Sequence, residues 1–216
     1  MVEEILILVD KDDNQIGTEE KVKCHLPNGK LHRAFTALLF DKEGKLVITK
    51  RAKEKMLWPG DWDGTFASHP RESETYVSSG ERRMPEEVGI NGKLDYLHKF
   101  EYHVNYKDVG SENEICGTLI GIIDESTILK KIKGEIDDIK KISSTELISE
   151  LKTNANRYCP WMLIALELLD ESNQQILNKH TTILSTWMSN DIHDALQEAI
   201  RCHLPSDKWR LVNEQK

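Results

Sequence analysis

One stretch of the chain, residues 57–90, constrains the fold more than any other. It opens with Trp58-Pro59-Gly60 and leads into a helix that we expect over residues 74–87. Counted from Ser68, a glutamate follows after five residues and an arginine after seven more. The register then continues through Met84, Glu86, Glu87, Gly89 and Ile90. Pro85 lies inside the expected helix, where it removes one backbone hydrogen bond. A fixed register of this kind predicts one defined loop–helix unit.

This register resembles the Nudix box, which runs Gly, five residues, Glu, seven residues, then Arg-Glu-apolar-x-Glu-Glu-x-Gly-apolar. Seven of its nine defined positions match. Ser68 stands in place of the glycine, and Arg83 in place of the first glutamate of the metal-binding trio. We expect these two departures, with Ala67 beside them, to decide the function.

The order of the expected elements indicates the fold class. Apolar runs bounded by turn residues predict strands over residues 3–9, 31–40, 46–50, 94–107, 114–123 and 136–142. Helices are expected over residues 74–87, 144–151 and 161–169. Strands before and after a central helix, with helices at the end, predict an α+β protein, in which a mixed sheet lies between helical layers as an α/β/α sandwich.

The composition changes at Asp170. Residues 171–175 are polar, and residues 176–203 carry apolar side chains at roughly helical intervals. We therefore expect two parts, a domain over residues 1–169 and a helical C-terminal extension over residues 170–216. The extension's helices pack either on the domain or on a second subunit, so a homodimer through the extension is one alternative.

Bulk properties narrow the class of partner. The net charge of −8 argues against a general nucleic-acid or anionic-membrane surface. The four cysteines lie far apart with no CxxC pair, which predicts reduced thiols in a cytoplasmic protein. The apolar run at residues 5–9 is too short for a signal sequence or a membrane span.

Three histidines and two carboxylates are candidates for a metal site. His25, His32 and His69 flank the expected strands and the box, and Glu112 and Glu114 are separated by one residue. In an extended segment the two carboxylates point to the same side. Such a five-ligand set suits Mn²⁺, Zn²⁺ or Fe²⁺. The alternative is that each histidine is an ordinary core or surface residue.

A longer series of short segments resembles the type I isopentenyl diphosphate isomerases of the Nudix superfamily. Their order and spacing are kept over about residues 1–170. The segments are Lys21, His25, Leu31-His32-Arg33-Ala34-Phe35, Arg51-Ala52, Lys55, Trp58-Pro59-Gly60, Ser68-His69-Pro70, Arg82-Arg83, Glu87-Val88-Gly89, Glu112-Asn113-Glu114-Ile115-Cys116 and Pro160-Trp161-Met162.

The resemblance implies a role for each matching residue. The catalytic metal, Mn²⁺ or Zn²⁺, would be held by His25, His32, His69, Glu112 and Glu114, and Glu87 would help to bind a Mg²⁺ that also contacts the diphosphate. The substrate's phosphate end would be bound by Lys21, Arg51, Lys55, Arg83 and Ser68. Arg83 then replaces a hydrolytic metal ligand with a phosphate-binding cation, which disfavours a hydrolase. The alternative for these cations is solvated surface.

The implied reaction moves a double bond by protonation and deprotonation. It interconverts isopentenyl and dimethylallyl diphosphate through a tertiary carbocation, and it needs an acid and a base within hydrogen-bond reach. Glu114 with Tyr102 resembles the family's acid, and Trp161 would face the cation with its ring. Core packing is the alternative for the two aromatic residues.

On the other side of the substrate the family places a cysteine, and here that position is Ala67. Asp63-Gly64 also departs from the common Thr-Asn, whereas Cys116 matches a family cysteine outside the catalytic position. The substitution is either engineered or natural. A natural variant isomerises with Glu114 and Tyr102 on one face, or with a water held by Ser68, Thr65 or Asp63.

Two other functions therefore stay open beside the isomerase. One is a Nudix-type hydrolase of a prenyl or nucleoside diphosphate, suggested by Glu86-Glu87. The other is a protein that binds a prenyl diphosphate and carries out different cation chemistry or none, suggested by Ala67.

Overall fold

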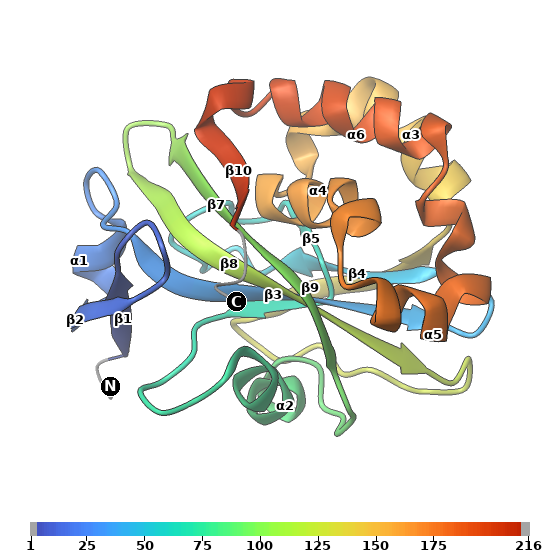
Figure 1. Cartoon of the computed structure of the whole chain (residues 1–216), viewed down its shortest axis with the longest axis horizontal. Helices are drawn as coiled ribbons and strands as arrows, with labels where there is room; N and C mark the ends of the chain where they lie inside the picture. The colour runs from blue at the N-terminus through green and yellow to red at the C-terminus, as the bar shows by residue number, and fades with distance from the viewer. Residues whose placement is uncertain (1–3, 213–216) are drawn as a thin grey trace.

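A mixed, strongly curved β-sheet forms the centre of the protein in the computed structural model, which describes residues 4–212 (Figure 1). Its strands are β1 Ile5–Val9, β2 Gln15–Glu20, β3 His32–Asp41, β4 Leu46–Arg51, β5 Trp62–Asp63, β6 Phe66–Ser68, β7 Asp95–Tyr106, β8 Gly110–Ile123, β9 Ile136–Ile142 and β10 Trp209–Val212. The α-helices are α1 Lys21–His25, α2 Tyr76–Glu87, α3 Ser144–Asn154, α4 Pro160–Glu167, α5 Gln174–Leu184 and α6 Asn190–Arg201.

Strand β3 pairs with other strands along both of its edges. One edge pairs in parallel with β8 over the whole length of β3. The other edge pairs in turn with β1, β6 and β4. Because β3 and β8 run in the same direction, His32 at the start of β3 is the register partner of Glu114. The sheet thus brings the start of β3, the end of β6 and the start of β8 to one end of the molecule.

Helix α2 covers one face of the sheet and lies below it in Figure 1. Thr75 caps its first turn, its side chain accepting from the Ser78 backbone while the Ser78 side chain accepts from Thr75. Gly80 allows a close approach to the sheet, since a Cβ there would lie 2.5 Å from Leu119 Cδ1. The helix continues through Pro85 and ends two residues later, at Glu87.

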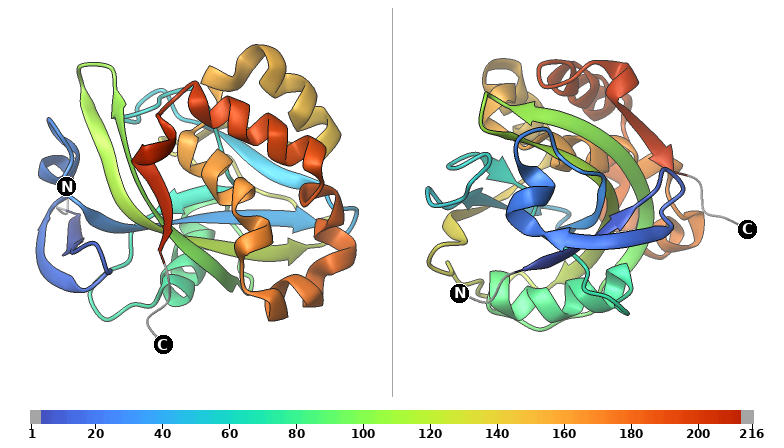
Figure 2. Two further views of the ribbon diagram at one scale, coloured as in Figure 1. Left: turned by 45° about the horizontal axis from the view of Figure 1, so that its top comes forward. Right: turned by 90° about the vertical axis from the view of Figure 1, so that its left-hand side faces the viewer.

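Helices α3 to α6 cover the opposite face (Figure 2). Alternation along β3 separates the two cores, with Phe35, Ala37 and Leu39 toward α2 and Ala34, Leu38 and Phe40 toward α4. Every residue of α4 is buried. The core on this side also contains apolar residues of the C-terminal segment: Leu177, Leu184, Trp187, Ile192, Leu196 and Leu204. The apolar faces of α5 and α6 therefore pack on their own chain.

The predicted α+β class, with helices on both faces of a mixed sheet, is confirmed. The division at residue 170 and a homodimer through residues 170–216 stay predictions. The described part of the extension contains α5 and α6 and then β10, a strand that pairs with β7 and that the composition did not indicate. Helix α1 and the short strands β5 and β6 were also not predicted.

The described residues also bear on the expectations about the cysteines and about membrane spans. The four cysteines are free, with Cys24, Cys116 and Cys159 buried and Cys202 exposed. Within residues 4–212, no helix combines the length and the apolar character that a membrane crossing requires.

Candidate active site

Four side chains from four elements converge at the end of the sheet where β3 and β8 begin. His25 is the last residue of α1, His32 the first of β3, His69 follows β6, and Glu114 lies on β8. One nitrogen or oxygen atom from each lies within 4.8 Å of the others. The centroids of the three imidazole rings are 4.8 to 5.6 Å apart. Four of the five predicted metal ligands thus form one cluster.

The outer nitrogen of each imidazole faces an acceptor. His25 Nδ1 donates to the Lys21 carbonyl at 2.6 Å, and His32 Nδ1 donates to the Lys30 carbonyl at 2.7 Å. His69 Nδ1 lies 3.5 Å from Glu4 Oε1, which is too long for a direct hydrogen bond. The two hydrogen bonds assign a proton to Nδ1 of His25 and of His32 and direct Nε2 of both rings inward, the arrangement found around metal ions.

The inner atoms are close to one another without forming good hydrogen bonds. Glu114 Oε1 lies 3.3 Å from His32 Nε2 and 3.5 Å from His69 Nε2, and His32 Nε2 is buried with no aligned partner. Buried acceptors without donors are costly unless a cation satisfies them. The cluster therefore fits a divalent metal ion with nitrogen and oxygen ligands.

Glu112, the fifth predicted ligand, lies at the edge of this cluster. It points to the same side of β8 as Glu114, as the two-residue period predicts. Its Oε2 atom is 3.0 Å from His25 Nε2. Burial disfavours the charged form of His25, but Glu112 outweighs that effect and raises the pKa of His25 to about 9.

Metal affinity should consequently depend on pH. His25 must lose its proton to bind a cation, so below its pKa of about 9 the apparent affinity falls by up to about tenfold per pH unit. We expect the Kd for Mn²⁺, measured by titration calorimetry, to decrease from about pH 6.5 to about pH 8.5. Glu112→Gln removes the charge that raises the pKa and should move the dependence to lower pH. A Kd that does not change over this range would contradict the expectation.

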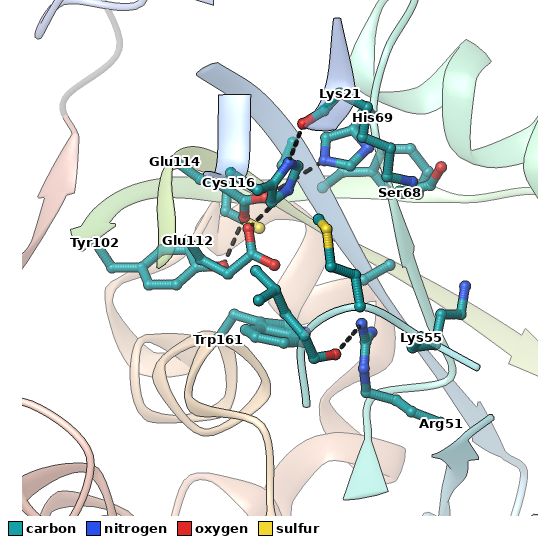
Figure 3. Close-up of a pocket in the computed structure, with 16 residues that line it drawn as sticks. Lys21, Arg51, Lys55, Ser68, His69, Tyr102, Glu112, Glu114, Cys116 and Trp161 are labelled. Carbon is teal, nitrogen blue, oxygen red and sulfur yellow. Dashed lines mark hydrogen bonds and ion pairs between the residues drawn. The ribbon is translucent and has the colours of Figure 1, made fainter. Parts of the chain in front are cut away.

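Tyr102 lies on β7 directly opposite Glu114. Its hydroxyl donates to Glu114 Oε2 at 2.6 Å, and both side chains are buried. Burial, with Glu114 adding to it, raises the pKa of Tyr102 well above its ordinary value, so the phenol keeps its proton. Cys116 follows on the same side of β8, and Figure 3 shows Tyr102, Glu112, Glu114 and Cys116 together on one wall of a pocket.

Trp161 closes the pocket from below in the view of Figure 3. It lies in the first turn of α4, whose backbone is tied to β5 by a hydrogen bond from Cys159 N to the Trp62 carbonyl at 2.7 Å. The indole nitrogen donates to Asp63 Oδ1 at 2.7 Å. The Trp58 ring packs edge-on against Trp161, with centroids 5.2 Å apart.

Three of the four predicted phosphate-binding cations line the pocket: Lys21, Arg51 and Lys55. Each has an acidic partner, since Lys21 is 2.8 Å from Glu4, Arg51 pairs with Asp63, and Lys55 pairs with Glu135. Arg83 is not among the described residues that line the pocket. It pairs with Glu86 at 2.6 Å and with Glu87. A diphosphate entering the pocket would have to compete with these carboxylates.

Ala67 and Ser68 form part of the wall opposite Glu114. Ala67 is the register partner of Thr36 on β3, and both Ala67 and Ser68 line the pocket. Ala67 also lines a smaller extension of the pocket together with Glu87 and Glu135. The methyl group of Ala67 cannot carry a proton, so acid–base chemistry cannot use the side chain at this position.

Comparison with known proteins identifies the family. A model of the NUDIX domain matches residues 30–163. The isopentenyl-diphosphate Delta-isomerase of Haloarcula marismortui is 36% identical over 171 residues, covering 77% of this chain and 91% of that protein. The chain belongs to the isopentenyl-diphosphate Delta-isomerase family.

Other similar proteins carry the same family name. The isopentenyl-diphosphate Delta-isomerase of Halobacterium salinarum is 35% identical over 166 residues, covering 74% of this chain and 78% of that protein. Isopentenyl-diphosphate Delta-isomerase 1 of Photorhabdus laumondii is 40% identical over 123 residues, covering 56% and 70%. Among solved structures, DR0079 of Deinococcus radiodurans shares the fold, with a TM-score of 0.54 at 20% identity over 70% of this chain and 90% of that one.

Some contacts in this member of the isopentenyl-diphosphate isomerase family were not expected from the sequence. Glu4 lies between Lys21 and His69, and Glu135 lies beside Lys55. The sequence suggested Asp63 only as a residue that could bind a water molecule. In the structure its oxygens accept hydrogen bonds from three donors of the protein. The Thr65 hydroxyl is also engaged within the protein, because it donates to the Val47 carbonyl and accepts from Leu39 N.

Proposed function

We propose that the protein interconverts isopentenyl diphosphate and dimethylallyl diphosphate. One observation carries the proposal: His25, His69 and Glu114 of the His/Glu cluster, with Tyr102 and Trp161, line a single pocket that also holds three cationic side chains. Such a pocket combines a diphosphate-binding end, an acid–base pair and an aromatic face, and these are the groups that a double-bond shift through a carbocation requires.

The cluster supports a resident divalent ion. His25, His32, His69 and Glu114 would hold Mn²⁺ or Zn²⁺, with Glu112 as the fifth ligand, since imidazole and carboxylate donors suit both ions. When bound, the ion supplies positive charge that fixes the Glu114 carboxylate and makes the groups attached to it more acidic. Glu87, on the extension of the pocket, would help to bind Mg²⁺ together with the diphosphate.

The proton transfers are assigned to the wall formed by β7 and β8. The Tyr102–Glu114 pair delivers one proton to the terminal carbon of the substrate's double bond, which leaves a tertiary cation on the next carbon. Trp161 faces that cation with its π system. Glu114 then removes one proton from the neighbouring CH₂ group and returns it to the Tyr102 oxygen through their hydrogen bond, so that the protonation state of the pair is restored after each turnover.

Ala67 is the reason for assigning both transfers to one wall. On the opposite side, Arg51 and Lys55 are paired cations, and Thr65 and Asp63 use their oxygens in the protein. Ser68 is left as the group there that can orient a water molecule. We therefore propose that the reaction proceeds without a thiol at position 67.

A hydrolase is less well supported by the geometry. Of the box's acidic positions, Glu87 points toward the pocket's extension, whereas Glu86 is exposed and pairs with Arg83. Nudix-type hydrolysis needs several carboxylates that gather metal ions at the diphosphate, and Arg83 takes one of these positions. We expect no phosphate release from isopentenyl diphosphate or from nucleoside diphosphates.

One assay separates the candidate functions. The purified protein, loaded with Mn²⁺ and supplied with Mg²⁺, is incubated with isopentenyl diphosphate, and the allylic isomer and released phosphate are measured in the same sample. The proposal expects the isomer and no phosphate. Phosphate release would favour the hydrolase, and neither product would favour a protein that only binds prenyl diphosphates.

A further inference from the structure

We propose that Asp63 is the positioning residue of the pocket, holding Arg51 at the diphosphate end and Trp161 at the carbocation end in fixed orientations. The inference rests on the proposed function, because it assigns Arg51 and Trp161 to the two ends of one substrate. Asp63 is outside the His/Glu cluster and is not among the described residues that line the main pocket, although it borders the smaller extension, and its oxygens are engaged by protein donors, so we assign its effect to its two partners.

The contacts of Asp63 are those of a fully engaged buried carboxylate. The residue is 2% exposed. Oδ1 accepts from Trp161 Nε1 at 2.7 Å and from Gly64 N at 2.7 Å, and Oδ2 accepts from Arg51 Nη1 at 3.0 Å. A buried carboxylate is tolerated only when it is paired and hydrogen-bonded, so these three donors and Asp63 depend on one another.

Arg51 is held on three sides. Besides the contact with Asp63, its Nε donates to the Trp58 carbonyl at 3.2 Å and its Nη2 to the Leu57 carbonyl at 3.0 Å. A guanidinium group has five N–H donors, so two remain for a phosphate oxygen. Because Arg51 also lines the pocket, Asp63 leaves it oriented for the diphosphate with those two donors free.

The same residues also hold the segment around Trp58. Trp58 has a φ of 48°, in the left-handed region that bulky side chains rarely adopt. Its carbonyl is bound by Arg51 and its ring packs on Trp161. Trp58, the residue with the strained backbone, therefore contacts Arg51 and Trp161, the two residues that Asp63 also binds.

Asp63 affects both the orientation and the electron density of the Trp161 ring. The hydrogen bond to the indole N–H fixes the plane of the ring. A carboxylate acceptor also makes the indole richer in electrons than a neutral acceptor would, which strengthens its attraction for a cation on the ring face. This part of the effect appears only when the substrate becomes positively charged, so it acts on kcat.

Two double-mutant cycles test the two contacts separately. Asp63→Asn removes the charge and presents an amide N–H₂ to Arg51. We expect it to weaken the binding of inorganic diphosphate with Mg²⁺ by about 10-fold and to lower kcat by about 10-fold, as for the loss of a charge-assisted hydrogen bond. In an Arg51→Gln background the binding effect should vanish and the kcat effect persist. In a Trp161→Phe background, which lacks the N–H, the kcat effect should vanish and the binding effect persist.

The control is Asp61→Asn, which changes a neighbouring buried carboxylate that faces Arg157 at 3.5 Å and not the pocket. It should leave both readouts near those of the wild type. Asp63→Thr is the second variant if Asp63→Asn does not fold. Additive effects in both backgrounds, or equal effects of Asp61→Asn, would overturn the proposal. Diphosphate binding is measured without turnover, so the Arg51 cycle stays informative even if no isomer forms and the proposed function fails.

Discussion

Replacing Glu114 with glutamine is expected to lower kcat for isomerisation by ~10²–10⁴-fold, the range typical of a lost general acid or base. The carboxylate accepts the Tyr102 hydroxyl at 2.6 Å and lies within 3.5 Å of two imidazoles of the cluster. Burial disfavours the charge of Glu114, but the nearby imidazoles of His32 and His69 outweigh it and keep the pKa of Glu114 well below its ordinary value, so an amide cannot reproduce the charge. The rate is measured by NMR with saturating isopentenyl diphosphate.

Glu101→Gln is a matched control for this variant. Glu101 lies on β7 next to Tyr102 but points away from the pocket and pairs with Arg210. It should keep nearly all activity. Because Glu114 is also a candidate metal ligand, the Mn²⁺ content of each variant is measured in parallel. A Glu114→Gln protein that keeps more than about one tenth of the wild-type kcat would contradict the assignment.

Replacing His32 with asparagine is expected to weaken metal binding by roughly 100-fold or more and to lower activity with it. Changes in the groups that only support metal ligands cost 10–100-fold, so a direct ligand should cost at least as much. His32 is fully buried and its inner nitrogen, which has no aligned hydrogen-bond partner, lies 3.3 Å from Glu114 Oε1 within the cluster. Bound Mn²⁺ is quantified by elemental analysis after dialysis.

The matched control is His103→Asn, because His103 is an exposed histidine on β7. It should bind metal as the wild type does. Added Mn²⁺ should also raise the melting temperature of the wild type and of the control, but not that of His32→Asn. Full metal occupancy of His32→Asn would exclude His32 as a ligand.

Part of the candidate metal cluster could be predicted from local spacing in the sequence. Glu112 and Glu114 needed only the two-residue period of a strand. His32 and Glu114 met because β3 and β8 are parallel partners, a pairing that the family resemblance implied and that no local pattern shows. The chemistry of the cluster was therefore predictable, whereas its register in the sheet was not.

The network beneath the pocket could not be predicted in the same way. Asp63 and Trp161 are 98 positions apart and meet because Trp62 forms a bridge to Tyr158. Strand β5 has two residues, too few to show a period. The C-terminal strand β10 was missed for a similar reason, since its four residues become a strand only by pairing with β7.

The structure shows the contacts of two positions of the Nudix box, the matching Glu74 and the departing Arg83. Glu74, a matching position, accepts a forked pair of hydrogen bonds from Arg82 at 2.6 and 2.9 Å, and its pKa is lowered to about 2. This pair ties the loop to α2. Arg83 instead pairs with Glu86 and Glu87 and takes a position that the box gives to a metal-binding carboxylate, while its phosphate-binding role stays a prediction. Ala67 lies beside the box, and the proposed mechanism works without a thiol at this position.

The most direct test of the central proposal is the reaction of isopentenyl diphosphate in D₂O, followed by NMR with the Mn²⁺-loaded protein and Mg²⁺. Protonation of the double bond from the Tyr102–Glu114 pair predicts dimethylallyl diphosphate that carries deuterium in a methyl group. Reversal predicts a slower gain of deuterium in the substrate. A folded, metal-loaded protein that forms no allylic product and incorporates no deuterium would contradict it.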